Sequence, residues 1–253
     1  MKNLIRRFVK KVVRSIGYDI VPRIKDGFPP DFEEEHIKIV KSVKPFTMTS
    51  IERIFALTEA VRYVIQNNVL GDIVECGVWK GGSMMAISKT LMNIENSEKH
   101  LYLYDTFEGM TKPKDIDISY DNVLASKEFE KTKMNDGSSS WCSAQLDDVK
   151  KAVYSTGYDK EKIHFIKGKV EDTIPAKVPE CISLLRLDTD WYESTRHELV
   201  HLFPKLSKGG VLIIDDYGYW KGVRKAVDEY ISENKISILL NRIDDTGRIG
   251  IKI

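Results

Sequence analysis

The sequence predicts one α/β domain built on a mostly parallel sheet and preceded by a short N-terminal extension. A chain of 253 residues with 42% hydrophobic content can bury one full core of this kind and is short for two. From residue 72 onward, short apolar runs alternate with helical stretches, which is typical of α/β folds. Near the C-terminus two more runs flank a turn, which adds an antiparallel element.

The apolar runs define the expected strands. Five are short and apolar enough to be buried on both faces of a sheet: Asp72–Cys76, His100–Tyr104, Lys162–Ile166, Ile182–Leu187 and Gly210–Ile214. Two more, Ser237–Ile243 and Arg248–Ile253, lie on either side of Asp244-Asp245-Thr246-Gly247, which is short and rich in turn residues. We therefore expect a seven-stranded sheet, mostly parallel, with a C-terminal antiparallel hairpin.

The start of the chain predicts a basic amphipathic helix. Between Lys2 and Arg14 there are six basic residues and no acidic one, and apolar residues recur at helical spacing. Three interpretations stay open: peripheral docking on an anionic membrane, self-association, and packing of the apolar stripe on its own domain. A proline-containing linker with Pro22 follows, so we assign residues 1–46 to the helix and linker and residues 47–253 to the main domain.

Two further segments of the main domain can be assigned. Thr49-Ser50-Ile51-Glu52 has capping-box spacing and predicts the start of a helix that ends near Asn67. Residues 111–160 contain few apolar runs, one expected helix at Ala144–Tyr154 and a soft stretch, Asn135–Ser140. Insertions of this length often act as lids, so we expect a lid-like segment; a passive surface loop is the alternative.

Charge and cysteine usage exclude several classes of protein. The formal net charge of +1 gives no global field for nucleic-acid binding, so no nucleic-acid partner is expected. Cys76, Cys142 and Cys181 are far apart and lack C-x-x-C spacing, which argues against disulfides and thiolate metal sites and favours the cytoplasm. There is neither a secretory signal pattern nor an apolar run long enough to span a membrane.

A glycine-rich turn after the first strand is the first chemical signal. Residues 75–82 read Glu-Cys-Gly-Val-Trp-Lys-Gly-Gly and lead into a helix. Glycine allows close approach of a ligand at the carboxyl end of a strand, but the spacing is neither a dinucleotide fingerprint nor a phosphate loop, which argues against a dehydrogenase. Glu75 suits a cationic ligand group, and Asp105 at the next strand end suits two ribose hydroxyls. Adenosine that carries an amino acid satisfies both.

Four carboxylates at two strand ends are the second signal. Asp188 and Asp190 follow the fourth strand, and Asp215 and Asp216 follow the fifth. Adjacent parallel strands would bring these acids together, and an all-oxygen set favours Mg²⁺ or a similar hard ion. Capping of the next helix explains one of them at most. Asp188-Thr189-Asp190 is also a D-x-D motif, so a metal-dependent glycosyltransferase is an alternative.

Four ordered motifs resemble the macrocin O-methyltransferase (TylF-type) family: residues 74–82, 103–110, 187–195 and 215–218. The resemblance extends from about residue 47 to the C-terminus. It implies a Rossmann-like class I methyltransferase fold and methylation of sugar hydroxyls with S-adenosylmethionine and Mg²⁺. The donor contacts that it implies are Glu75, Gly77, Gly81 and Asp105, with Glu171 and Asp172 near the adenine. The metal ligands that it implies are Asp188, Asp215 and Asp216.

The expected reaction is methyl transfer to a hydroxyl of a small-molecule glycoside or glycan, such as a macrolide-like natural product or a surface polysaccharide precursor. Coordination to Mg²⁺ or Mn²⁺ lowers the pKa of a hydroxyl, so a nearby carboxylate can take its proton. Asp188 is expected to be both ligand and general base, with Asp190 as the alternate base. The non-catalytic alternative is a membrane- or partner-binding protein that acts through the basic helix. A homo-oligomer is compatible with both the enzymatic and the non-catalytic alternative.

Overall fold

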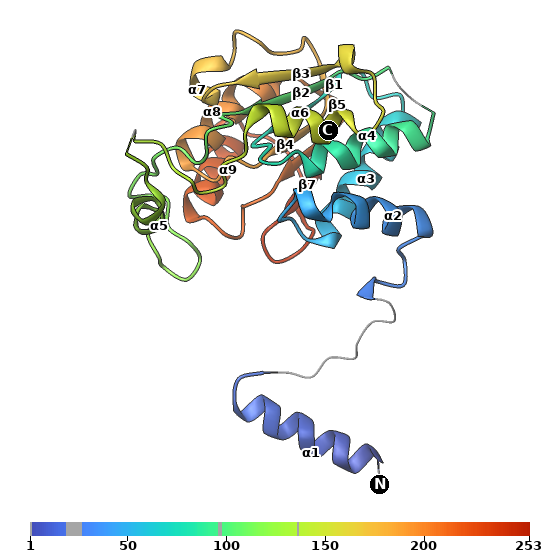
Figure 1. Cartoon of the computed structure of the whole chain (residues 1–253), viewed down its shortest axis with the longest axis vertical. Helices are drawn as coiled ribbons and strands as arrows, with labels where there is room; N and C mark the ends of the chain where they lie inside the picture. The colour runs from blue at the N-terminus through green and yellow to red at the C-terminus, as the bar shows by residue number, and fades with distance from the viewer. Residues whose placement is uncertain (1, 19–26, 96–97, 136) are drawn as a thin grey trace. The chain divides into compact units, whose positions relative to one another are not determined.

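A computed structural model describes residues 2–18, 27–95, 98–135 and 137–253 (Figure 1). The chain divides into two compact units, Met1–Ile37 and Lys38–Ile253, which we call the N-terminal unit and the α/β unit. The N-terminal unit contains α1 (Lys2–Ser15), which confirms the helix expected from the basic amphipathic pattern. Pro22 of the expected linker lies outside the described residues.

The stretch expected to be a linker also contains α2 (Glu34–Val43), followed by a 3-10 turn at Lys44–Phe46. Two glutamates lie in the first turn of α2, where negative charge stabilises a helix N-terminus. Val40 and Val43, at helical spacing, are buried. The sequence analysis missed α2 because its apolar stripe is short and follows a proline pair.

The α/β unit is built on one seven-stranded sheet with the order β3-β2-β1-β4-β5-β7-β6. Its strands are β1 (Asp72–Cys76), β2 (Leu101–Asp105), β3 (Ile163–Lys167), β4 (Ile182–Leu187), β5 (Leu206–Ile214), β6 (Asn241–Arg242) and β7 (Arg248–Ile251). Strands β1 to β5 are parallel, while β7 is antiparallel to both β5 and β6. The predicted sheet and its C-terminal hairpin are confirmed. The strand order reverses between β1 and β4, and such a switch point is where open α/β sheets bind ligands.

The helices form two groups that cover the sheet (Figure 1). One group comprises α3 (Ile51–Gln66), α4 (Gly82–Asn93) and α6 (Leu146–Tyr154); the other comprises α7 (Val170–Thr173), α8 (Tyr192–Leu202) and α9 (Lys221–Glu233). Because helices cover both faces, the middle of the sheet is buried on both sides, as at Val74 and Leu185.

The start of α3 differs by one residue from the expected capping box. Ser50 is the N-cap, and its Oγ accepts a hydrogen bond from the Arg53 backbone N–H at 3.1 Å. Thr49 lies just outside the helix, and its Oγ1 is 3.5 Å from Asp215 Oδ2. The shift places the Arg53 side chain in the first turn of α3.

The described residues of the insertion at 111–160 are folded. The insertion contains α5 (Ala125–Thr132), which the sequence analysis missed, and α6, which lies within the expected helix. At its start, the Met110 N–H donates to the Trp141 carbonyl at 2.9 Å, and the Lys221 N–H donates to the Ile118 carbonyl at 2.8 Å. The insertion is therefore joined to the start of α9.

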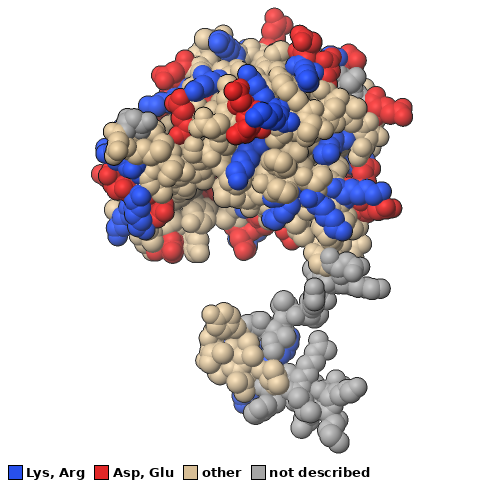
Figure 2. Space-filling view, in the orientation of Figure 1, with Lys and Arg blue, Asp and Glu red and all other residues tan. Residues whose placement is uncertain are grey.

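The surface of the α/β unit carries both signs of charge. On the face seen in Figure 2, basic and acidic side chains are interspersed, as the balanced composition predicts. Within the described part of the chain, each helix is too short or too polar to cross a bilayer.

Candidate active site

A cavity of about 430 Å³ opens where the carboxyl ends of β1, β2, β4 and β5 meet. This volume suits a small organic ligand. The strand ends, the segment before α3 and the insertion all contribute to its wall, which includes Phe46, Thr47, Arg53, Gly77, Val78, Asp105, Trp141, Cys142, Glu171, Arg186, Asp188, Asp190, Asp215, Asp216, Tyr219 and Trp220. The glycine turn and the acidic residues therefore face one space, although their sequence positions are far apart.

Gly77 lets the ends of β1 and β4 come together. Its φ is 84°, in the left-handed region, and a Cβ there would lie 1.9 Å from the Asp188 carbonyl oxygen. The Asp188 N–H donates to the Cys76 carbonyl at 2.8 Å, which closes the same contact. Gly77 lines the cavity as expected, but the close approach that needs glycine is to backbone.

Gly81 also serves packing. Its φ is 87°, and a Cβ would lie 2.8 Å from Val153 Cγ2 on α6. Gly81 is not part of the cavity wall, whereas the next residue, Gly82, is. A donor contact at Gly81 stays a prediction.

Asp105 holds the glycine turn. Its Oδ2 accepts hydrogen bonds from the backbone N–H groups of Val78 (2.7 Å) and Trp79 (2.9 Å), and its Oδ1 accepts one from Phe107 (2.6 Å). One carboxylate at the end of β2 thus fixes the backbone after β1. Asp105 also lines the cavity, and because both lone pairs of Oδ2 are occupied, a ligand could be met only through Oδ1.

Glu75 lies behind the cavity wall. It is fully buried, and its Oε1 accepts a hydrogen bond from Arg186 Nη1 at 2.5 Å, while Oε2 is buried without a hydrogen-bond partner. Burial raises the pKa of Glu75 to about 7, although the charge of Arg186 opposes the shift. Arg186, and not Glu75, forms part of the wall, so the donor contact expected of Glu75 stays a prediction.

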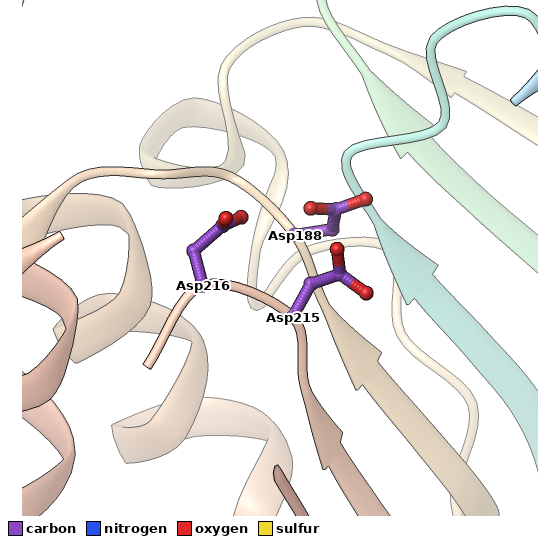
Figure 3. A group of neighbouring side chains, drawn as sticks. All are labelled: Asp188, Asp215 and Asp216. Atoms are coloured by element: carbon purple, nitrogen blue, oxygen red, sulfur yellow. The ribbon is translucent and has the colours of Figure 1, made fainter. Parts of the chain in front are cut away.

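Asp188, Asp215 and Asp216 form a three-carboxylate group, which we call the acidic cluster. Each offers an oxygen within 4.8 Å of the others, as the sequence predicted, and Figure 3 shows them at the ends of β4 and β5. Burial, with the neighbouring carboxylates, raises the pKa values of Asp188 and Asp216 well above the usual range. A cation between these groups would relieve their repulsion.

Two arginines already neutralise part of this charge. Arg186 Nη2 contacts Asp188 Oδ2 at 2.8 Å and Asp215 Oδ1 at 2.6 Å, and Arg53 Nη1 contacts Asp215 Oδ2. The sequence analysis missed both. Arg186 carried a signal, because it is the only charged residue in the apolar run Ile182–Leu187. Arg53 carried none, since its position resembles any polar site in a first helical turn.

Asp190 lies beside the acidic cluster on the same cavity wall. Its φ of 68° lies in the left-handed region, which is uncommon for residues other than glycine. Trp220 Nε1 donates to Asp190 Oδ1 at 2.8 Å. Burial, with the charge of Asp188, raises the pKa of Asp190 to about 7.

The two residues expected near an adenine lie on α7. Glu171 is part of the cavity wall and Asp172 is not. Lys169 and Val170 line the cavity next to Glu171, so this edge of the site consists of the turn after β3. The roles of Glu171 and Asp172 stay predictions.

An aromatic group borders the acidic side. The Trp191 and Trp220 rings are 5.2 Å apart, and Trp141 from the insertion lies 5.6 Å from Trp191 and 6.3 Å from Trp220 in edge-on contacts. Tyr219 stacks edge-on against Trp220 at 4.9 Å. Trp141, Tyr219 and Trp220 face the cavity, so the acidic cluster lies next to an aromatic wall.

Comparisons with known proteins identify the family. Residues 36–249 match the Macrocin-O-methyltransferase (TylF) family. Demethyldecarbamoylnovobiocin O-methyltransferase from Streptomyces niveus is 31% identical over 201 residues, which are 79% of this chain and 73% of that protein. The 8-demethyl-8-(2,3-dimethoxy-alpha-L-rhamnosyl)-tetracenomycin-C 4'-O-methyltransferase from Streptomyces olivaceus is 30% identical over 249 residues, covering 97% and 91%.

A solved structure agrees with these matches. The structure of the O-methyltransferase NovP has a TM-score of 0.71 and 30% identity, with 82% of each chain covered. The calicheamicin methyltransferase CalS11, at 16% identity and a TM-score of 0.60, shares the fold. The family match covers most of the chain, and the fold is the class I methyltransferase fold. This protein therefore belongs to the macrocin O-methyltransferase (TylF) family and is an O-methyltransferase.

Proposed function

We propose that this protein is a cytoplasmic, S-adenosylmethionine- and Mg²⁺-dependent (or Mn²⁺-dependent) O-methyltransferase that acts on a sugar-type hydroxyl of a glycoside or glycan. One observation carries the proposal: the glycine turn with Asp105 and the acidic cluster face the same cavity. The relatives support the acceptor class, because the S. olivaceus protein is named for 4'-O-methylation of a rhamnosyl tetracenomycin. Family membership argues against the glycosyltransferase alternative.

The donor side is formed by the turn after β1 and the end of β2. Gly77 and Asp105 would meet the donor's amino-acid and ribose portions, and Glu171 would meet the adenine edge. Gly81 and Asp172 would act from behind the wall by supporting α4 and α7. Glu75 would provide negative charge below the donor's cationic end, at a distance set by its pairing with Arg186.

The acidic cluster fits a hard divalent ion by its chemistry. It offers three carboxylates from two strand ends, and oxygen ligands are what Mg²⁺ and Mn²⁺ prefer. Both Asp215 oxygens accept from arginines, and Oδ2 also accepts from Thr49 Oγ1 at 3.5 Å, but Oδ1 keeps a second lone pair for an ion. A divalent ion held by Asp188, Asp215 and Asp216 supplies a Lewis acid that makes the acceptor hydroxyl easier to deprotonate.

Two aspartates are candidates for the general base. Asp190 is favoured on geometry, because it lies on the cavity wall beside the acidic cluster and is oriented there by the hydrogen bond from Trp220 Nε1 to its Oδ1. The sequence favoured Asp188 as the base and Asp190 as the alternate; we reverse that order because Asp188 would also bind the ion and already pairs with Arg186. Either residue takes the proton from the hydroxyl while the rest of the site positions the reacting groups for an in-line transfer.

The aromatic wall supports a sugar acceptor. Trp141, Tyr219 and Trp220 offer apolar ring faces next to the acidic cluster, where the C–H face of a sugar can pack while its hydroxyls point at the carboxylates. A vicinal diol suits such a site, because two neighbouring oxygens can approach the ion together. Trp141 belongs to the insertion, so the insertion would act as the acceptor-side lid that keeps water from the reaction.

A separate proposal concerns α1. Val9, Val12 and Ile16 are 41%, 47% and 67% exposed, and Lys10, Lys11 and Arg14 alternate with them. An exposed apolar stripe beside basic residues supports peripheral docking on an anionic lipid surface. The wild type should sediment with phosphatidylglycerol vesicles, whereas Val12→Glu should stay in the supernatant. No binding to these vesicles, with a larger oligomer in wild type than in Val12→Glu, would favour self-association.

Calorimetry and a methyl-transfer assay test the enzymatic proposal. S-adenosylmethionine should bind, whereas a nucleotide sugar and NAD should not. Transfer to glycosides with a vicinal diol should stop in excess EDTA and return with Mg²⁺ or Mn²⁺. Full activity in EDTA would contradict the metal-dependent mechanism, and absence of donor binding would contradict the donor pocket.

A further inference from the structure

Arg53 connects the acidic cluster to a part of the chain far from it in sequence. Its Nη1 contacts Asp215 Oδ2 and lies 3.4 Å from the Asp215 carbonyl oxygen, while its Nε donates to Asp244 Oδ2 at 2.7 Å. One guanidinium therefore bridges the end of β5 and the turn between β6 and β7. A planar fork with several donors can do this, and a lysine ammonium on its flexible stem cannot reproduce it.

Asp244 is itself fixed on two sides. Its Oδ1 accepts hydrogen bonds from the backbone N–H groups of Thr246 (3.0 Å) and Gly247 (2.7 Å), so it organises its own turn. Its Oδ2 accepts from Ser50 Oγ at 2.6 Å as well as from Arg53. Ser50 is the N-cap of α3, so the helix start and the hairpin turn are joined at a single carboxylate.

The surrounding backbone leaves room for this arrangement. At Gly247 a Cβ would lie 2.9 Å from Arg53 Cδ, so a side chain there would press on the arginine stem. At Gly218, just after the acidic cluster, a Cβ would lie 2.5 Å from the Asp245 carbonyl oxygen, and the Gly218 N–H donates to the Thr246 carbonyl at 2.9 Å. The hairpin turn thus packs on the loop that follows Asp215 and Asp216.

We propose that Asp244 and Arg53 form a positioning arm that sets the orientation of Asp215 for divalent-cation binding. The inference rests on the proposed function, because it assigns Asp215 to a metal site. Arg186 holds one Asp215 oxygen and Arg53 the other, so the arm and Arg186 together fix the carboxylate plane. Outer partners of this kind typically change metal affinity about 10- to 100-fold when altered.

Two conservative variants isolate the arm. Arg53→Lys keeps the positive charge near Asp215 but cannot bridge two carboxylates. Asp244→Asn keeps an oxygen for the Thr246 and Gly247 N–H groups, and it turns an amide NH₂ toward the donors on Ser50 and Arg53. Arg62→Lys is the matched control: it lies on α3 as well, pairs with Glu59 at 3.2 Å and is not part of the cavity wall.

The test is Mn²⁺ affinity by calorimetry in the full chain, with S-adenosylmethionine affinity and unfolding temperature measured in parallel. Arg53→Lys and Asp244→Asn should each weaken Mn²⁺ binding about tenfold or more, and the double variant should be little weaker than either single one. Donor affinity should stay within about twofold, and Arg62→Lys should match the wild type. In turnover assays the Mn²⁺ concentration needed for half-maximal activity should rise, while the KM for the donor should change little.

Three outcomes would overturn the positioning arm, and they can be told apart. Wild-type affinity for Mn²⁺ in both variants, or losses that add fully in the double variant, would overturn the positioning arm and leave the proposed function intact. A wild-type chain that binds no Mn²⁺ would overturn the metal site of the proposed function and the arm with it. A loss of donor affinity that parallels the loss of Mn²⁺ affinity would show general damage to the fold and would also overturn the arm.

Discussion

The two sides of the cavity satisfy their carboxylates in different ways. On the donor side, Asp105 is held by three backbone N–H groups from the adjacent strand end and from its own turn. On the acidic side, Asp215 is held by two guanidinium groups, from Arg53 on α3 and Arg186 on β4. The first arrangement depends on backbone geometry and the second on side chains that converge from distant positions.

This difference matters for chemistry. Backbone donors hold a carboxylate in place, which suits a residue that binds the same ligand part in every cycle. Arginine partners leave a crowded acidic group only partly neutralised, and the pKa values of Asp188 and Asp216 stay raised because of burial and mutual repulsion. We infer that the donor side is set by the fold alone, whereas the acidic side keeps negative charge that a divalent ion would offset.

The sharpest way to separate the two sides is to neutralise the acidic cluster. Asp188→Asn and Asp215→Asn should each lower turnover by about 10⁴-fold, or ~5 kcal/mol, because a ligand for the divalent ion is lost. S-adenosylmethionine affinity should stay near that of the wild type. Single-turnover kinetics and calorimetry on the same preparations check this.

Asp190→Asn is the companion variant. If Asp190 is the general base, it should lower turnover about 10²- to 10⁴-fold while Mn²⁺ affinity is retained. If Asp188→Asn and Asp215→Asn lose donor affinity as strongly as turnover, the donor side and the acidic side are one coupled site. The proposed difference between the two sides would then be wrong.

The next effect concerns stability. Arg186 pairs with Glu75, Asp188 and Asp215, and its side chain is 4% exposed. Arg186→Met leaves buried acids without their cation and should lower the free energy of unfolding by about 3–5 kcal/mol, measured by urea denaturation. Arg196→Met removes a more exposed pair with Glu233 and should cost about 1 kcal/mol or less. Similar losses for the two variants would contradict the conclusion that the buried ion pairs of Arg186 stabilise the fold more than an exposed pair does.

A smaller effect is expected on the donor side. Asp105→Ala frees the Val78 and Trp79 N–H groups and should weaken S-adenosylmethionine binding about 10- to 100-fold, with Mn²⁺ affinity unchanged. Asp148→Ala, an exposed residue of α6 outside the cavity wall, is the control and should bind the donor within about twofold of the wild type. Donor affinity that survives Asp105→Ala would place the ribose elsewhere.

Features that depend on the local sequence pattern could be predicted. Buried strands are visible as apolar runs, and the strand ends carry Gly77, Asp105 and Asp188 in motifs that can be read along the chain. The parallel topology then brings those ends together, so a cavity with acids on one side could be expected before any coordinates. Strand limits were less accurate: β5 begins at Leu206, before Gly209-Gly210, and β6 is only Asn241–Arg242.

The partners of the acids could not be predicted, because they are tertiary contacts. Arg53 lies 162 positions before Asp215 and 191 before Asp244 along the chain. No periodic pattern connects residues at such separations. Crowded carboxylates favour a nearby cation, but arginines are cations as well, and only the fold reveals that two of them point at Asp215.

The smallest expected effect is the pH dependence that Asp244 contributes. Partial burial opposes the shift, but hydrogen bonds from Ser50 and Gly247 and the charge of Arg53 lower the pKa of Asp244 to about 2, below its usual 3.8. A carboxylate with a lowered pKa in the folded state stabilises the fold above its unfolded pKa, and this contribution is lost as the pH falls through the folded value. Solvent screening limits this contribution to about 1 kcal/mol or less, which corresponds to ~2–4 °C in a domain of this size.

Unfolding temperatures measured from pH 5 to pH 2 should therefore fall more steeply in the wild type than in Asp244→Asn, and Asp245→Asn in the same turn should follow the wild type. Parallel curves for the wild type and Asp244→Asn would contradict a stabilising contribution from the Asp244 charge.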